Sequence, residues 1–132
     1  MKGTLLVLVL VGVFAAGVGT FAHHSFSATY REDLTVTIEG ELVQFLFRNP
    51  HSFVHVMAED EAGKRQRWSV EWGGGAQLGR QGVSRGTLKP GDHVVITGNP
   101  GRDPNEHRIR LRTLHRPSDG FSWGTLQGEV ID

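Results

Sequence analysis

Histidine is the residue type in this chain best suited to metal chemistry, and four of its positions fall in or near two short motifs. The chain has seven histidines and no cysteine. A metal ion would therefore be held by nitrogen and oxygen atoms. The first motif is Ala22-His23-His24-Ser25-Phe26, and the second is Asn49-Pro50-His51. Imidazoles from two parts of a folded chain predict a transition-metal site if the fold brings them together.

The 22 N-terminal residues have the pattern of a secretory signal peptide. Lys2 supplies a positive charge, and residues 5–18 form an uncharged, mainly apolar run. This run is shorter than the roughly 20 residues that a membrane-spanning helix needs, so a permanent anchor is the weaker alternative. Thr20 and Ala22 are small residues suited to a cleavage site between Ala22 and His23. We therefore expect an exported protein, periplasmic or extracellular, without a stable membrane span after cleavage.

Cleavage after Ala22 would give His23 a free α-amine beside its own imidazole. The amine and Nδ1 form a two-nitrogen chelate, and a third nitrogen can come from His24 or His51. This arrangement resembles the amino-terminal histidine brace of copper oxygenases and copper carriers. It suits Cu(II), which prefers tetragonal nitrogen coordination and has the highest affinity among first-row divalent metals. The predicted ligands are His23, His24 and His51, with copper as cofactor; the alternative is an arm without a ligand role.

His55 and Glu71 are second-rank candidates for the same site. His55 follows His51 by four residues, and a straight strand would separate the two by roughly 13 Å. Because both rings would need to lie within about 2.1 Å of one ion, His55 falls outside a site centred on His51. Glu71 could accept a hydrogen bond from a ligating imidazole and hold its tautomer, or pair with Arg65, Arg67 or another cross-strand arginine.

The elements that must position these residues show a period of two, which is typical of β-strands. Leu34, Val36 and Ile38 alternate with polar residues, and the phase slips at Gly40, where we expect a β-bulge or bend. Five strands are predicted over residues 34–47, 52–58, 65–72, 93–98 and 107–115, with a short helix over residues 76–81.

This order predicts a mainly β fold, a five-stranded OB-like Greek-key barrel with a short helix between strands three and four. The barrel follows an N-terminal signal helix, and an open β-sandwich is the alternative. The expected organisation is a signal peptide (1–22), an N-terminal arm (23–33), the barrel domain (34–116) and a C-terminal tail (117–132). In the third strand Trp68 and Trp72 are predicted to face the core, and Glu71 the opposite side.

The order of the motifs resembles that of a known family. The AHHSF start, the NPH turn, the strand with Glu71 and the turn at residues 88–92 are similar to small exported bacterial proteins grouped as a domain of unknown function. The resemblance covers about residues 22–114 and implies a small barrel but no activity. Residues 73–75 are all glycine, which departs from the Gly-Ser-Pro type that we would expect there.

Charge is balanced overall but divided along the sequence. The 14 Lys+Arg equal the 14 Asp+Glu, and without a basic surplus a nucleic-acid partner is not expected. Residues 31–61 are mainly acidic and residues 80–116 mainly basic. Arg108, Arg110 and Arg112 alternate along the fifth strand and form a candidate anion-binding face. The alternative function is therefore a non-enzymatic module for a small anionic ligand or a protein partner in the envelope.

Catalytic sequence patterns are absent from the chain. It has no nucleophile elbow, HExxH motif, P-loop or paired-carboxylate pattern. We therefore assign no catalytic residue and expect a non-enzymatic protein, with a copper oxidase or a hydrolase as a third hypothesis. The leading hypothesis is an exported protein that binds copper for carriage or buffering.

Overall fold

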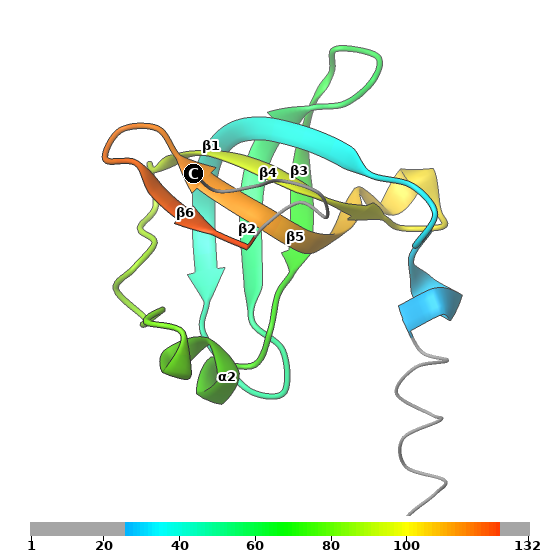
Figure 1. The fold of residues 1–132 in the computed structure, drawn as a ribbon. Helices are drawn as coiled ribbons and strands as arrows, with labels where there is room; N and C mark the ends of the chain where they lie inside the picture. Colours follow the sequence, from blue (N-terminus) through cyan, green and yellow to red (C-terminus); the bar gives the residue numbers. More distant parts are fainter. Residues whose placement is uncertain (1–25, 125–132) are drawn as a thin grey trace, which may run out of the picture.

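The computed structural model describes residues 26–124, which are mainly β-strands (Figure 1). The strands are β1 (Val36–Leu46), β2 (Phe53–Glu59), β3 (Arg65–Glu71), β4 (His93–Pro100), β5 (Arg108–Arg116) and β6 (Phe121–Trp123). A short helix, α2 (Gly75–Arg80), lies between β3 and β4, and a 3₁₀ turn, η1 (Pro104–Glu106), lies between β4 and β5. The predicted fold class and the predicted place of the helix are therefore confirmed.

The first five strands close into a barrel. The strand order is β3-β2-β1-β4-β5-β6, and an additional pairing joins β3 to β5. That pairing is parallel and sets Ser69, Val70 and Glu71 opposite Arg108, Ile109 and Arg110. The other pairings among the named strands are antiparallel. These pairings form the OB-like Greek-key barrel that the sequence predicts.

The barrel interior is filled by alternate residues of its strands. Val54, Val56, Val70, Val94, Ile96 and Ile109 have no exposed surface, and Leu78 of α2 is equally buried. Burying an aliphatic side chain of this size contributes about 1.5–3 kcal/mol. A slip of one residue would turn these side chains to solvent, so the alternation also fixes the register of the strands.

Strand β1 changes phase, but at a different residue from the one predicted. The pairing of β1 with β2 shifts register between Leu42 and Gln44, so that Val43 is the extra residue. Gly40 pairs regularly, and its role is close strand contact: a Cβ there would lie 2.0 Å from the carbonyl oxygen of Met57. The predicted bulge at Gly40 is therefore wrong, because that glycine admits a neighbouring backbone and the bulge follows it.

The segments on both sides of the predicted barrel pack against it. Residues 26–29 form one helical turn, and Tyr30 pairs with Gly101 and is 1% exposed. The backbone N–H of Arg31 donates to the carbonyl oxygen of Pro100 at 2.8 Å. Strand β6 lies within the segment expected to be a C-terminal tail and pairs with β5. The arm and β6 thereby become part of the surface around β5.

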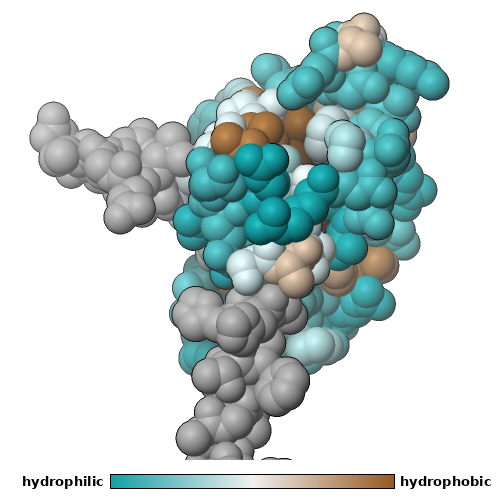
Figure 2. All heavy atoms as spheres, turned by 90° about the vertical axis from the view of Figure 1, so that its right-hand side faces the viewer, coloured by the Kyte–Doolittle hydropathy of each residue, from teal (hydrophilic) through white to brown (hydrophobic). Residues whose placement is uncertain are grey.

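The described residues have a largely hydrophilic surface on the face shown in Figure 2, where the hydrophobic patches are small. Among these residues, no helix combines the length and the apolar character needed to cross a membrane. The predicted signal peptide and its cleavage site lie outside the described residues.

Candidate functional site

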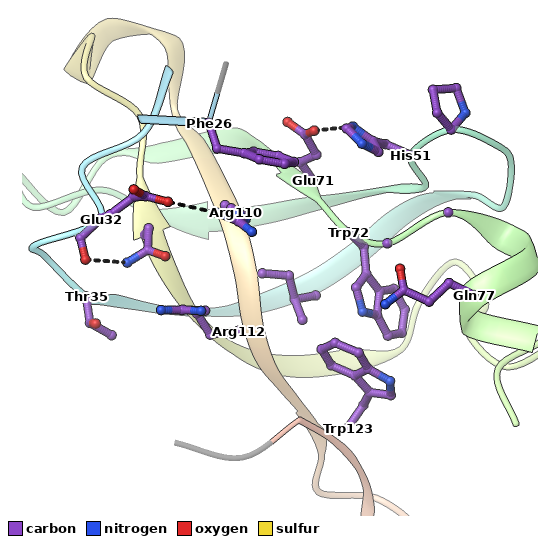
Figure 3. Close-up of a pocket in the computed structure, with 15 residues that line it drawn as sticks. Phe26, Glu32, Thr35, His51, Glu71, Trp72, Gln77, Arg110, Arg112 and Trp123 are labelled. Atoms are coloured by element: carbon purple, nitrogen blue, oxygen red, sulfur yellow. Dashed lines mark hydrogen bonds and ion pairs between the residues drawn. The ribbon is translucent and has the colours of Figure 1, made fainter. Parts of the chain in front are cut away.

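A cavity of about 1090 Å³ lies where the barrel closes (Figure 3). Its lining comes from segments that are far apart in the sequence: Phe26, Glu32, His51, Glu71, Arg110 and Trp123. The parallel pairing of β3 with β5 explains this convergence, because it sets the end of β3 beside the start of β5. The cavity therefore joins the arm, the turn after β1 and strand β6 at one place.

Glu71 holds the ring of His51 through one nitrogen. Nδ1 of His51 contacts Oε1 of Glu71. The histidine side chain is 40% exposed, whereas Glu71 as a residue is only 8% exposed. Because Nδ1 is engaged, Nε2 is the nitrogen left for another partner, and no described residue is bonded to it. A buried carboxylate thus orients a half-exposed imidazole at the wall of the cavity.

The second oxygen of Glu71 binds the arm. The hydroxyl of Tyr30 donates to Oε2 of Glu71, and Nη2 of Arg108 lies 3.5 Å from the same oxygen. Burial, together with the nearby carboxylate, raises the pKa of Tyr30, so the phenol remains a donor at neutral pH. Glu71 therefore has both kinds of partner that the sequence suggests, an imidazole and a cross-strand arginine.

A stack of side chains connects the arm to His51. The ring centroids of Phe26 and His51 are 5.6 Å apart with an interplanar angle of 27°. Cζ of Arg110 lies 3.9 Å from the Phe26 centroid, and Nη1 of Arg110 lies 3.0 Å from Oε1 of Glu32. Figure 3 shows Phe26 next to the Glu71–His51 pair. The first described residue of the chain is therefore packed on the predicted loop ligand.

The structure places only one of the three leading metal candidates. His51 lies at the cavity, whereas His23 and His24 lie outside the described residues. Between residues 26 and 124, no three or more His, Asp or Glu side chains form a group that could hold a metal ion. Two of the three predicted ligands therefore lie outside the described residues.

His55 lies apart from this arrangement. It occupies β2 opposite Ser69 of β3, and it does not line the cavity. Burial lowers the pKa of His55, and the positive charges of Arg67 and Arg48 lower it further. His55 therefore lies outside the cavity lining that includes His51.

The three arginines of β5 differ in their partners. Arg108 pairs with Glu71 and Glu106, and Arg110 pairs with Glu32. The side chain of Arg112 makes no hydrogen bond or ion pair with any described residue. It is the extra residue at a register shift between β4 and β5, a position where a bulge can redirect a side chain. Of these three arginines, Arg112 is the one whose charge has no ion-pair partner among residues 26–124.

Two residues that position the site were not identified from the sequence. Tyr30 holds the arm against the barrel through its hydrogen bond to Glu71. It is the one tyrosine of the chain and follows Phe26 by one helical turn, and this spacing is only a weak sequence signal for such a role. Asn99 is 2% exposed, and its Nδ2 donates to the carbonyl oxygen of Leu34 at 2.7 Å. No local pattern marks Asn99, because its partner lies on a distant segment.

Fold and site together define a small OB-like barrel whose closure cavity is lined by an N-terminal arm. Residues 10–110 match a family described as "Family of unknown function (DUF6152)", and the chain belongs to this family. Curated proteins gave no significant match. The family match agrees with the resemblance seen in the sequence, but it identifies neither the two histidine motifs nor an activity.

Proposed function

We propose that this protein binds copper after export, through His51 and the N-terminal histidines His23 and His24, and carries or buffers the ion. The observation that carries the proposal is the packing of Phe26 on His51. Phe26 follows His24 by only two residues. The proposal is for binding without turnover, and it includes the predicted cleavage after Ala22.

The chain length available to the N-terminal histidines supports this proposal. Two residues of extended chain span at most about 7 Å, and three span about 11 Å. The ring of Phe26 already lies 5.6 Å from that of His51. The short chain between Phe26 and the two histidines therefore allows His23 and His24 to reach an ion bound at Nε2 of His51. An arm that led away from this loop would prevent such a site.

The chemistry of His51 also supports the proposal. A metal-ligating histidine commonly donates its other ring N–H to a carboxylate, which fixes its orientation and raises its basicity. Glu71 is placed to accept that bond from Nδ1. The α-amine and Nδ1 of His23 would supply two further nitrogens. Three nitrogens favour Cu(II) over the harder cations Mg²⁺ and Ca²⁺.

The test is a Cu(II) titration of the protein that begins at His23, in competition with a chelating dye. We expect His51→Gln to weaken Cu(II) binding at least about tenfold, because it removes one of three nitrogen ligands. An alanine added before His23 should weaken binding similarly, since it separates the α-amine from the first imidazole. His55→Gln is the matched control and should bind as the wild type does.

Thermal unfolding of each variant checks that it is folded before titration. Equal Cu(II) affinity for the wild type and His51→Gln would overturn the site. The intact mass of the exported protein is a separate check: a mature chain that starts elsewhere than at His23 would exclude the α-amine as a ligand.

A further inference from the structure

The geometry points to a second binding function of the closure cavity: it takes an organic anion with a flat apolar body. In this site Arg112 receives the anionic group, and Trp123, together with the small exposed part of Trp72, contacts the apolar body. The inference rests on described residues alone and goes beyond metal binding, because His51 has no part in it.

The charges around the cavity favour an anion over a cation. Its two carboxylates already have cationic partners: Glu32 pairs with Arg110 at 3.0 Å, and Glu71 pairs with Arg108 at 3.5 Å. Arg112 also lines the cavity but has no partner among residues 26–124. An arginine guanidinium binds a carboxylate by charge-assisted and often bidentate hydrogen bonds. The unpaired charge at this cavity is therefore positive.

The other side of the cavity is aromatic. The rings of Trp72 and Trp123 meet edge to face, with centroids 5.1 Å apart and an interplanar angle of 81°. Figure 3 shows both tryptophans on the side opposite Arg112 and Thr35. Aromatic faces of this kind bind flat apolar groups well. An occupant with a charge at one end and a ring system at the other matches this division.

Two uncharged polar side chains complete the arrangement. Thr35 lies on the arginine side and Gln77 on the tryptophan side, and neither is hydrogen-bonded to another described residue. Binding sites for small molecules typically combine apolar walls with a few polar groups that fix orientation. The cavity of about 1090 Å³ is large enough for a small organic molecule. A small amphipathic acid therefore fits both the size and the lining.

The experiment is a titration of ¹⁵N-labelled, chelator-treated protein, followed by two-dimensional NMR. The probes are naphthalene-1-acetate and naphthalene-1-acetamide, which share a ring system and differ in charge. We expect the acetate to bind about tenfold more tightly, as a charge-assisted hydrogen bond implies. The indole signals of Trp72 and Trp123 should shift, whereas that of Trp68, which is not in the cavity lining, should not.

Two charge-removing variants assign the effect. Arg112→Gln should lower the acetate affinity to that of the acetamide and leave the acetamide affinity unchanged. Lys64→Gln removes an equal charge from the turn between β2 and β3 and should change neither affinity. Equal affinity for the two probes, a shift of Trp68 alone, or an unchanged acetate affinity in Arg112→Gln would each overturn the inference. The titration contains no metal, so its result is independent of copper binding.

Discussion

The two ends of β5 each hold an arginine network, and the two differ in what they leave open. Near the C-terminal end, Nη1 of Arg116 lies 2.7 Å from both Oδ2 of Asp92 and the carbonyl oxygen of Thr87. Nε and Nη2 bind the carboxylate of Asp119 at 3.0 and 2.8 Å. Near the N-terminal end, Arg108 lies 3.5 Å from Glu71, which also binds His51 and Tyr30.

The Arg116 network joins parts of the fold, whereas the Glu71 network reaches the candidate site. The Arg116 network is closed: its carboxylates also accept backbone N–H groups, from Lys89 to Asp92 and from Phe121 to Asp119. These bonds join two turns of the chain. The Glu71 network instead ends in the half-exposed ring of His51 at the cavity, with Nε2 unbonded among the described residues. We therefore expect substitutions in the two networks to separate stability from binding.

The largest loss of stability should follow Arg116→Met. The side chain of Arg116 is 14% exposed and interacts with two carboxylates. Arg116→Met removes a guanidinium that donates to two partly exposed carboxylates and to the carbonyl oxygen of Thr87, which costs about 3 kcal/mol in all. This loss is measurable as a lower urea midpoint at unchanged slope. Copper and naphthalene-1-acetate should bind the folded variant as they bind the wild type. A clear loss of copper affinity would contradict the assignment of this network to structure.

Glu71→Gln should have a smaller effect on stability but a clear effect on metal binding. It keeps the shape of the side chain but replaces the charged acceptor of Tyr30 and His51, which costs about 2 kcal/mol. Copper affinity should fall about tenfold, as is typical when the carboxylate partner of a ligating histidine is removed. The readouts are urea unfolding and the chelator competition. Unchanged copper affinity would mean that Glu71 has only a structural role.

Tyr30→Phe tests whether the arm is held through Glu71. The variant loses one hydrogen bond to a buried carboxylate and should be destabilised by about 1.5 kcal/mol. Because the contact of His51 with Glu71 remains, copper affinity should fall less than in Glu71→Gln. Urea unfolding and copper titration of both variants provide the comparison. A larger copper effect in Tyr30→Phe would reverse the roles assigned to these two residues.

Phe26→Leu tests what the ring contact between Phe26 and His51 contributes. The ring packs between His51 and Arg110, and exchanging it for an aliphatic side chain should cost about 0.5–1 kcal/mol. We expect a several-fold loss of copper affinity, since the arm would lose its alignment with the loop histidine. Chelator competition measures this loss, with His55→Gln as control. Equal affinity would show that the stack does not position the N-terminal ligands.

The smallest effect concerns His55, whose pKa is lowered in the folded state by burial and by two arginines. A histidine with a lowered folded pKa contributes stability above its unfolded pKa of about 6.5, and this contribution is lost as the pH falls through the folded value. His55→Gln should therefore lose less thermal stability than the wild type between about pH 7.5 and 5. An equal loss in both proteins would remove His55 as a source of acid sensitivity.

The sequence predicts the barrel well because the patterns that indicate its strands and its helix lie within short stretches of the chain. Alternating apolar residues indicate the strands, and the glycines after β3 precede the short helix. The face of Glu71 follows from the same alternation. The position of the bulge does not, because a glycine marks either a bulge or a close strand contact, and Gly40 has the second role.

The parts of the site that escape prediction depend on long-range contacts. Tyr30 and Glu71 are separated by 41 positions, and Asn99 donates to the carbonyl oxygen of Leu34 across 65. No periodicity encodes such pairs. The sequence also does not show that Arg112 lacks a partner. The three arginines of β5 have the same spacing in the sequence, and they differ only in the carboxylates that the fold brings to Arg108 and Arg110.

His51 and the mature N-terminus are proposed to bind one copper ion together. Electron paramagnetic resonance of the Cu(II)-loaded protein starting at His23 tests it most directly, by comparison with His51→Gln. We expect nitrogen hyperfine structure from three equatorial nitrogens in the wild type and from one fewer in the variant. Identical spectra at full copper loading would contradict it.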